Sequence, residues 1–303
     1  MTHEGAAQAA ARENAAAAAD SELMTGFPPV PEARVTLANW QDPPFNRWAF
    51  KHMRELIPSH LIAADRTGQG GPSPLPAAHV PLPDPLVWRL DGSTATAAEV
   101  FADTYTDALV VLHDGRLVTE RYDAGMTAAT PHLLMSVSKS LVGCVAGVLA
   151  DRGLLNPGAQ LTAYVPEAEA SGYADATIRN LLDMRTGVAF SETYTALDAE
   201  VRVMERSMGW RPARPGDPAG AYPYLITLGQ DGRHGAEFTY RSADTDMLGW
   251  VCERASGTRM ADLISALIWQ PIGAERDAEI RSAIRVPLAR SHAQPSMSLS
   301  ADR

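Results

Sequence analysis

The sequence is poor in lysine and lacks long apolar runs. Only two of its 26 basic residues are lysines, Lys51 and Lys139, so arginine carries nearly all of the positive charge. No apolar run reaches the roughly 18 residues that a membrane-spanning helix needs. Acidic residues outnumber basic ones, which gives a formal net charge of −10. An acidic chain offers little electrostatic attraction to nucleic acid, so we expect no nucleic-acid partner. Because no apolar run is long enough, we also expect no membrane span.

Cysteine and histidine are too sparse and too scattered to indicate a metal site or a disulfide. Cys144 and Cys252 are the only cysteines, and each lies in an apolar stretch typical of a helix, which predicts two buried, reduced thiols. Neither H-E-x-x-H nor C-x-x-C occurs, so we expect no metal and no cofactor. A G-x-S-x-G motif is also absent, which argues against an α/β-hydrolase.

The first 26 residues lack the features of a secretory signal. They carry acids and amides instead of a basic segment followed by an apolar one. We expect residues 1–30 to form a disordered tail, residues 31–280 to form one domain, and the protein to be cytoplasmic.

Alternation and helical periodicity place the main elements of this domain. Residues 107–122 predict a β-hairpin that turns at Asp114-Gly115. A long buried helix is expected after Pro131, ending near Gly153, and two helices are expected within 242–269, separated at Ser256-Gly257. Shorter helices are predicted in the second half of 36–58 and at 176–184, whereas 67–88 is rich in Pro and Gly and should be extended. An early hairpin followed by helices indicates an α+β domain with a helical subdomain.

The start of the long helix carries the strongest chemical signal. A serine hydroxyl is a poor nucleophile until a neighbouring group removes its proton. Ser136 and Lys139 are three residues apart at a helix start and therefore share one face. A lysine amine can lose its proton in a protein, whereas an arginine cannot, and this chain keeps a lysine here. The alternative is that Ser136 caps the helix and Lys139 is an ordinary surface residue.

Tyr240 is the second candidate catalytic residue. In hydrolases with an S-x-x-K motif, a second motif can place a tyrosine near the lysine, where its hydroxyl passes a proton to the leaving group. Here Tyr240-Arg241-Ser242 stands just before a predicted helix. An ordinary half-buried strand tyrosine is the alternative interpretation.

Several segments together resemble a known enzyme family. They are residues 40–50, 132–143, 181–190, 208–211 and 240–257. They are similar to the 6-aminohexanoate-dimer hydrolases, which are nylon-oligomer hydrolases related to the family VIII carboxylesterases and the class C β-lactamases. The resemblance implies a β-lactamase/transpeptidase-like α+β fold, with an antiparallel sheet flanked by helices.

The resemblance also implies roles for individual residues. Ser136 would be the nucleophile, Lys139 its base and Tyr240 the proton donor to the leaving amine. By position, Tyr194 resembles a lid tyrosine that closes on the substrate, and Trp210 resembles a pocket wall. Glu205 stands where the family has an aspartate that holds the substrate ammonium, although a solvated helix face is an equally good interpretation of Glu205 from sequence.

The resemblance ends at about residue 280. Residues 281–303 become rich in Ser and Arg without a clear period, as a frameshift or a truncated reading frame would produce. We therefore expect the last strands of the family's sheet to be missing, together with one of the two N–H donors of the oxyanion hole. Losing one such donor typically costs about 10²- to 10³-fold in rate.

The sequence supports a hydrolase of linear amides, such as 6-aminohexanoate dimer, or of small esters, acting on a small-molecule substrate without a cofactor. The alternatives are a catalytically impaired remnant of such an enzyme, a promiscuous short-chain carboxylesterase and a D-amino-acid peptidase. A homodimer is left open.

Overall fold

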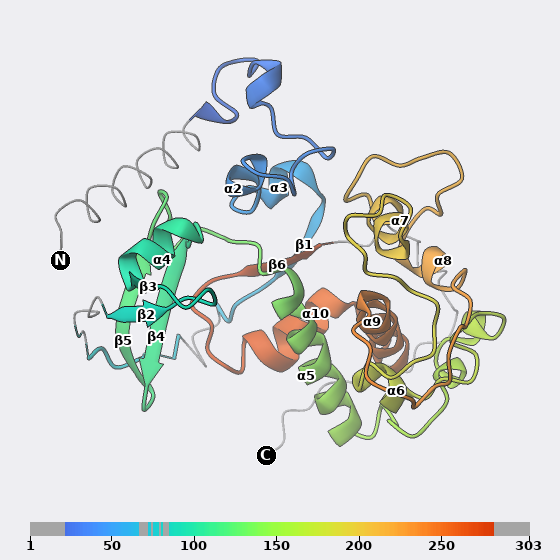
Figure 1. Cartoon of the computed structure of the whole chain (residues 1–303). Coiled ribbons are helices and arrows are strands. Elements are labelled where there is room, and N and C mark those ends of the chain that lie inside the picture. Colours follow the sequence, from blue (N-terminus) through green and yellow to red (C-terminus); the bar gives the residue numbers. More distant parts are fainter. Residues whose placement is uncertain (1–21, 67–71, 74, 79, 81–84, 282–303) are drawn as a thin grey trace.

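The computed structural model describes residues 22–66, 72–73, 75–78, 80 and 85–281. In Figure 1 the strands within residues 86–122 lie on one side of a central helix, α5, and the helices within residues 178–256 lie on the other side. The helical segments, in chain order, are η1 (Pro31–Ala33), α2 (Phe45–Ala49), α3 (Met53–Leu56), α4 (Ala97–Asp103), η2 (Met135–Val137), α5 (Ser138–Asp151), η3 (Leu161–Ala163), η4 (Pro166–Ala168), α6 (Ile178–Leu182), α7 (Glu200–Ser207), α8 (Ala221–Leu225), α9 (Ser242–Ser256), α10 (Met260–Ile264) and the π-helical turn η5 (Ser265–Trp269).

The strands of the described residues form three separate two-stranded antiparallel ladders. They are β1 (Ser59–Ile62) with β6 (Ala278–Arg281), β2 (Leu86–Trp88) with β3 (Thr94–Thr96), and β4 (Ala108–His113) with β5 (Arg116–Tyr122). The expected α+β class with antiparallel pairing is confirmed. The expected single sheet is not seen among these residues, because the ladders are not hydrogen-bonded to one another.

The β4–β5 hairpin forms as the sequence predicts. Asp114 and Gly115 have φ values of 49° and 70°, and positive φ at both central residues is the geometry that suits a two-residue hairpin turn. The register shifts between Val111 and Leu112. Val110 and Leu112 are both about half exposed, so the hairpin is only partly covered.

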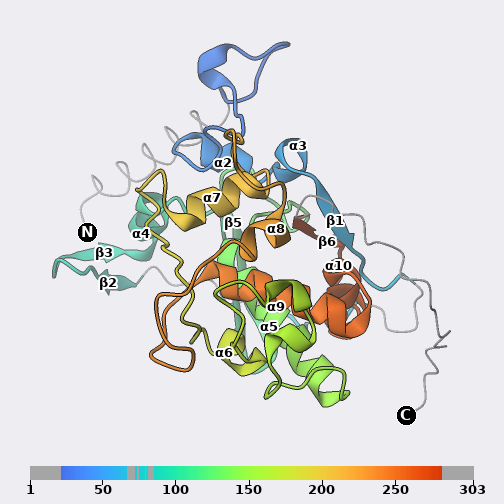
Figure 2. The ribbon, with the colours of Figure 1, turned by 90° about the vertical axis from the view of Figure 1, so that its right-hand side faces the viewer.

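The β1–β6 ladder joins the early and late parts of the chain. Ser59 pairs with Arg281 and Ile62 pairs with Ala278. The two strands lie side by side next to α10 in Figures 1 and 2. This pairing brings Arg281, the last described residue, beside a segment more than 200 residues earlier in the sequence.

Helix α5 was expected to be buried, and it is buried on one face only. Val145, Ala146 and Leu149 are in the core, where α5 packs against α9 and α10. Cys144 lies on the other face and is exposed, so its predicted burial is wrong, whereas Cys252 on α9 is buried and both thiols are free. Helical periodicity identifies the apolar face of a helix but not how far a neighbour covers the rest.

Helices α9 and α10 confirm the two helices expected within 242–269. Helix α9 ends at Gly257, whose φ of 68° gives the left-handed C-cap that glycine favours. Its buried residues include Met247 and Val251 in the main core. The helix expected at 176–184 is α6, which begins with a capping box at Thr177.

A second, smaller core holds the N-terminal segment. Leu23, Val35, Trp40, Ala49 and Ile57 are buried together there. Residues 1–21 of the expected tail lie outside the described residues. Leu23, which was also expected in the tail, packs into this core, so the chain around Leu23 belongs to the domain. The single helix expected near residue 50 is divided into α2 and α3.

Within the described ranges, no helix is both long enough and apolar enough to cross a lipid bilayer. The cytoplasmic location stays a prediction.

Candidate active site

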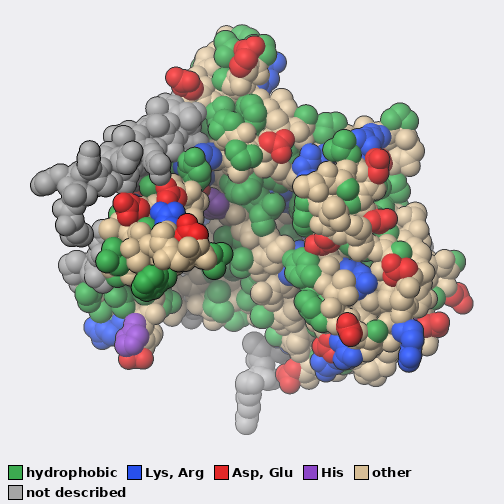
Figure 3. Space-filling view, in the orientation of Figure 1, with side chains coloured by type: hydrophobic (Ala, Val, Ile, Leu, Met, Phe, Trp, Pro, Cys, Tyr) green, Lys and Arg blue, Asp and Glu red, His purple; other side chains and the backbone are tan. Residues whose placement is uncertain are grey.

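A broad groove runs across the face shown in Figure 3, where apolar side chains line a hollow between the two sides of the molecule. Its volume is about 2150 Å³, well above the roughly 300–1,000 Å³ of a typical small-molecule pocket, so it is an open groove and not a closed cavity. Its walls come from the α2–α3 segment, the turn before α5, helices α7 to α9, and the β1–β6 ladder.

The turn before α5 presents Ser136 to this groove. Met135, just before it, has φ of 46°, a left-handed conformation that is uncommon for a residue with a side chain. Lys139, on the first turn of α5, donates a hydrogen bond from Nζ to Ser136 Oγ over 3.0 Å. Ser136 is exposed, so the pair predicted from its spacing is in contact and open to a ligand.

An ion pair supports the segment that leads into this turn. His132 Nε2 lies 3.0 Å from Asp107 Oδ2, and His132 Nδ1 lies 2.9 Å from the Leu133 carbonyl oxygen. Both ring nitrogens face acceptors, which favours the doubly protonated ring, and the Asp107 hydrogen bond raises the pKa of His132. Burial opposes ionisation of Asp107, but His132, Lys51 and Arg47 outweigh it and lower the pKa of Asp107.

Tyr240 lies beside the Ser136–Lys139 pair. Lys139 Nζ is 5.4 Å from the centre of the Tyr240 ring, and Tyr240 is 40% exposed. The next residue, Arg241, is buried and donates from Nη1 to the Thr186 carbonyl oxygen over 2.9 Å. This bond fixes the backbone that carries Tyr240 into α9.

Glu192 connects the loop carrying Tyr194 to the start of α9. It accepts a 2.6 Å hydrogen bond from the Ser242 backbone N–H and a 3.4 Å hydrogen bond from the Tyr194 hydroxyl. A carboxylate at a helix N-terminus is favourable because unpaired N–H groups point toward it. Partial burial and the Glu192 charge raise the pKa of Tyr194 to about 12, so the Tyr194 hydroxyl is a hydrogen-bond donor at neutral pH.

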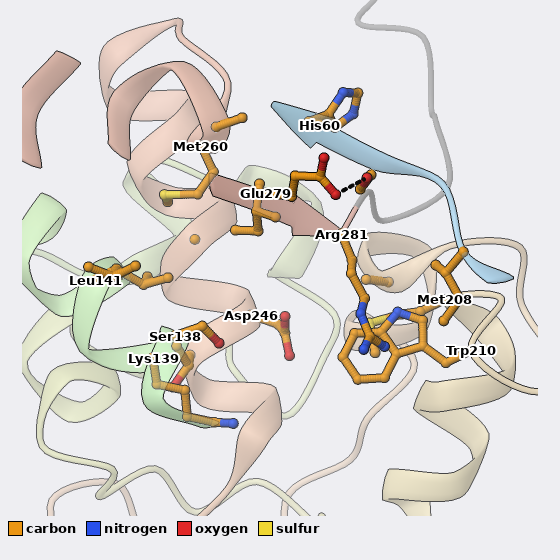
Figure 4. A pocket seen from close by; sticks show the side chains of 18 of the residues that line it. His60, Ser138, Lys139, Leu141, Met208, Trp210, Asp246, Met260, Glu279 and Arg281 are labelled. Carbon is orange, nitrogen blue, oxygen red and sulfur yellow. Dashed lines mark hydrogen bonds between the residues drawn. The ribbon is translucent and has the colours of Figure 1, made fainter. Parts of the chain in front are cut away.

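Asp246 is a groove residue that the sequence analysis missed. It lies one turn after Ser242 on α9, and both residues line the groove. Figure 4 shows Asp246 on the side of the groove that carries Lys139. Burial raises the pKa of Asp246 to about 6, although the charge of Lys139 opposes the shift. The spacing of four residues from Ser242 could have identified it, because residues four apart share a helix face.

Glu205 and Trp210 lie at the other end of the groove. Glu205 is only 5% exposed, which excludes the solvated helix face that the sequence left open. Its Oε2 accepts from Arg202 Nη1 and from Arg211 Nε, each over 2.7 Å, and its Oε1 accepts from Gln41 over 3.0 Å. The Trp210 ring meets Trp40 edge-on at 6.4 Å.

The structure thus brings Ser136, Lys139 and Tyr240 together and places Tyr194, Glu205 and Trp210 along the same groove. The catalytic and substrate-binding roles of these residues stay predictions. Arg281 at the Trp210 end was also missed, and no local sequence signal could have found it, because its position depends on the β1–β6 pairing.

Comparison with known proteins gives three kinds of match: a family model, a sequence relative and a solved structure. The model of the Beta-lactamase family matches residues 95–294. The chain is 40% identical over 257 residues to the 6-aminohexanoate-dimer hydrolase of Paenarthrobacter ureafaciens, which covers 84% of this chain and 62% of that protein. A solved structure from Bacillus anthracis, provisionally named a 6-aminohexanoate-dimer hydrolase, superposes with a TM-score of 0.75 at 28% identity over 82% of this chain and 64% of its own. The chain therefore spans less than two thirds of each of these two relatives.

Proposed function

Since the chain belongs to the Beta-lactamase family, we propose that it is a serine hydrolase that cleaves linear amides or esters through an acyl-enzyme on Ser136. The observation that carries the proposal is the 3.0 Å contact between Lys139 Nζ and Ser136 Oγ. At that distance a neutral amine can take the hydroxyl proton directly.

Acylation uses three side chains in the proposed mechanism. Lys139, as the neutral amine, takes the proton from Ser136 Oγ while Oγ bonds to the substrate carbonyl carbon. The C–N or C–O bond of the substrate then breaks as the leaving group takes a proton from the Tyr240 hydroxyl. The ammonium of Lys139 returns a proton to Tyr240, so the amine is neutral again when the acyl-enzyme has formed.

Deacylation repeats these steps with water as the nucleophile. Water adds to the ester carbonyl carbon and gives its proton to the Lys139–Tyr240 pair. The bond to Ser136 Oγ breaks, Oγ takes that proton back, and a carboxylic acid leaves. No redox partner or metal enters this balance.

The substrate class is part of the proposal. A groove with an apolar lining suits a linear chain with one reactive carbonyl near Ser136. Because a 40% identical relative is named a 6-aminohexanoate-dimer hydrolase, that linear amide is the first amide to test, with p-nitrophenyl butyrate as the ester.

A fluorophosphonate probe tests the nucleophile directly, because it reacts covalently with activated serines. We expect the full chain to be labelled, and Ser136→Ala to abolish labelling. Ser140→Ala is the matched control: it removes an exposed serine hydroxyl one turn later on α5, and this variant should be labelled like the wild type.

The outcomes separate the proposal from the impaired-remnant hypothesis. Labelling at Ser136 with hydrolysis of either substrate supports the proposal. A folded chain that is neither labelled nor active would overturn it and favour a non-catalytic remnant. Labelling that survives Ser136→Ala would place the nucleophile elsewhere.

A further inference from the structure

The carboxylate of Glu205 is already engaged within the protein. It accepts hydrogen bonds from Gln41, Arg202 and Arg211, and its side chain is only 6% exposed. A substrate ammonium would have to compete with two guanidinium groups at 2.7 Å. Displacing an arginine would leave a buried charge without its partner, which is costly.

Arg281 is the opposite case. Its guanidinium carbon lies 4.7 Å from the centre of the Trp40 ring and 4.4 Å from that of Trp210. Nη1 and Nη2 are buried and have no hydrogen-bond partner among the described residues. Glu279, two residues earlier on the same face of β6, is already bound by Arg54 and Ser59.

Figure 4 shows Arg281 extending from β6 to Trp210 across the groove from Lys139. The two tryptophan rings meet at 72°, so they form a corner around the guanidinium. Cation–π contact holds the charge there, and no described residue accepts a hydrogen bond from Nη1 or Nη2.

The charge balance at this end of the groove is positive. One carboxylate, Glu205, faces three guanidinium groups, those of Arg202, Arg211 and Arg281, which leaves a net charge of +2 for these four residues (3 − 1). Burial lowers the pKa of Arg281 to about 10, and Glu205 opposes the shift, so the guanidinium stays charged at neutral pH. The acidic groups nearer to Lys139 are Asp246 and Glu192.

We propose that Arg281 binds a carboxylate of the substrate, so that the groove selects linear amides or esters with an anionic far end and not a cationic one. A guanidinium offers paired N–H donors that match the two oxygens of a carboxylate. The inference rests on the proposed function, because it assigns the end of the groove that lies away from Ser136. It also reverses the ammonium-binding role that the resemblance gave to Glu205.

Three p-nitrophenyl esters with six-carbon acyl chains test the selection: the half-ester of adipic acid, the ester of hexanoic acid and the ester of 6-aminohexanoic acid. We expect kcat/KM to fall in that order, with at least a tenfold difference between the anionic and the cationic ester. The difference should shrink in high salt, because salt screens charge interactions. Equal rates, or a preference for the cationic ester, would overturn the inference.

Variants of Arg281 test whether this side chain determines the preference for the anionic ester. Arg281→Gln should lower the anionic-to-cationic ratio of kcat/KM at least tenfold, and Arg281→Lys should keep part of it. Arg179→Gln is the control, because Arg179 on α6 is 61% exposed, pairs with Asp183 and does not line the groove; its ratio should match the wild type. If Arg281→Gln does not fold, the Lys variant and the salt dependence decide.

A binding measurement keeps this inference separate from the proposed function. Hexanoate and hexylammonium are titrated at equal ionic strength while the tryptophan fluorescence is followed, since Trp40 and Trp210 border Arg281. Tighter binding of hexanoate that is lost in Arg281→Gln supports the inference even if no ester is hydrolysed. Tighter binding of hexylammonium contradicts it even if hydrolysis is fast.

Discussion

The two ends of the groove use charged side chains in different ways. At the Ser136 end, Lys139 contacts an exposed hydroxyl, and Tyr240 stands beside it with 40% of its surface exposed. At the other end, Glu205 is buried under hydrogen bonds from both Arg202 and Arg211. The first end leaves reactive atoms open to a ligand, whereas the second engages its carboxylate in structure. A groove residue of suitable charge is therefore a binding group only when its hydrogen-bonding capacity is still free.

The largest effect should come from the base at the open end. Lys139→Arg keeps a positive charge but cannot accept a proton, so kcat/KM for p-nitrophenyl butyrate should fall on the order of 10³- to 10⁴-fold, which is about 4 to 5.5 kcal/mol. Lys51→Arg changes the only other lysine of the chain and should cause less than a tenfold loss. Equal losses in the two variants would contradict a base at Lys139.

At the Glu205 end of the groove, a substitution should mainly lower the free energy of unfolding. Glu205→Gln removes the charge shared by Arg202 and Arg211, and breaking a buried pair in this way costs about 3 kcal/mol. Urea unfolding measures the change. Glu167→Gln breaks a pair with Arg254 that is about 40% exposed on both sides and should cost less than about 1 kcal/mol. A stability of Glu205→Gln equal to that of the control would mean that the Glu205 pairs are not structural.

The tyrosine at the open end should contribute less than the lysine. Tyr240→Phe keeps the ring beside Lys139 and removes only the hydroxyl that we propose protonates the leaving group. An amide should lose about 10²-fold in kcat, and a p-nitrophenyl ester should lose less, because nitrophenolate leaves without a proton. Tyr105→Phe is the control, because Tyr105 follows α4 and does not line the groove. An ester and an amide that lose activity equally would argue against proton donation by Tyr240.

The smallest expected effect concerns the free energy of unfolding that the His132–Asp107 pair contributes, and how this contribution changes with pH. The raised pKa of His132 stabilises the fold below its ordinary pKa of about 6.5, and this contribution is lost as the pH rises through the raised value. The lowered pKa of Asp107 stabilises the fold above about 3.8, and this contribution is lost as the pH falls. The pair should therefore be most stabilising between about pH 4 and pH 6.5.

Unfolding by urea at pH 5.5 and at pH 8.5 measures this contribution. His132→Gln should reduce the pH dependence, whereas His113→Gln, at an exposed histidine, should leave it unchanged. A wild-type pH dependence that persists in His132→Gln would assign it to other groups.

The open end of the groove was predictable because its geometry is local. Ser136 and Lys139 are one helical turn apart, and the Asp114-Gly115 turn and the Gly257 cap depend on neighbouring residues. The other end was not predictable, because Gln41 reaches Glu205 across 164 residues and Arg281 reaches Trp40 only after β1 pairs with β6. The wrong prediction for Cys144 has the same cause, since tertiary packing decides which face of α5 is covered.

The most direct test of the account is to capture the acyl-enzyme. The full chain is mixed with p-nitrophenyl butyrate, quenched in acid and analysed by mass spectrometry, intact and after digestion with trypsin. We predict one butyryl group per chain, located on Ser136 in the peptide 122–139, which trypsin releases because Arg121 and Lys139 flank the two cleavage sites. Hydrolysis that continues unchanged in Ser136→Ala, or a butyryl group found on Ser138, would contradict the account.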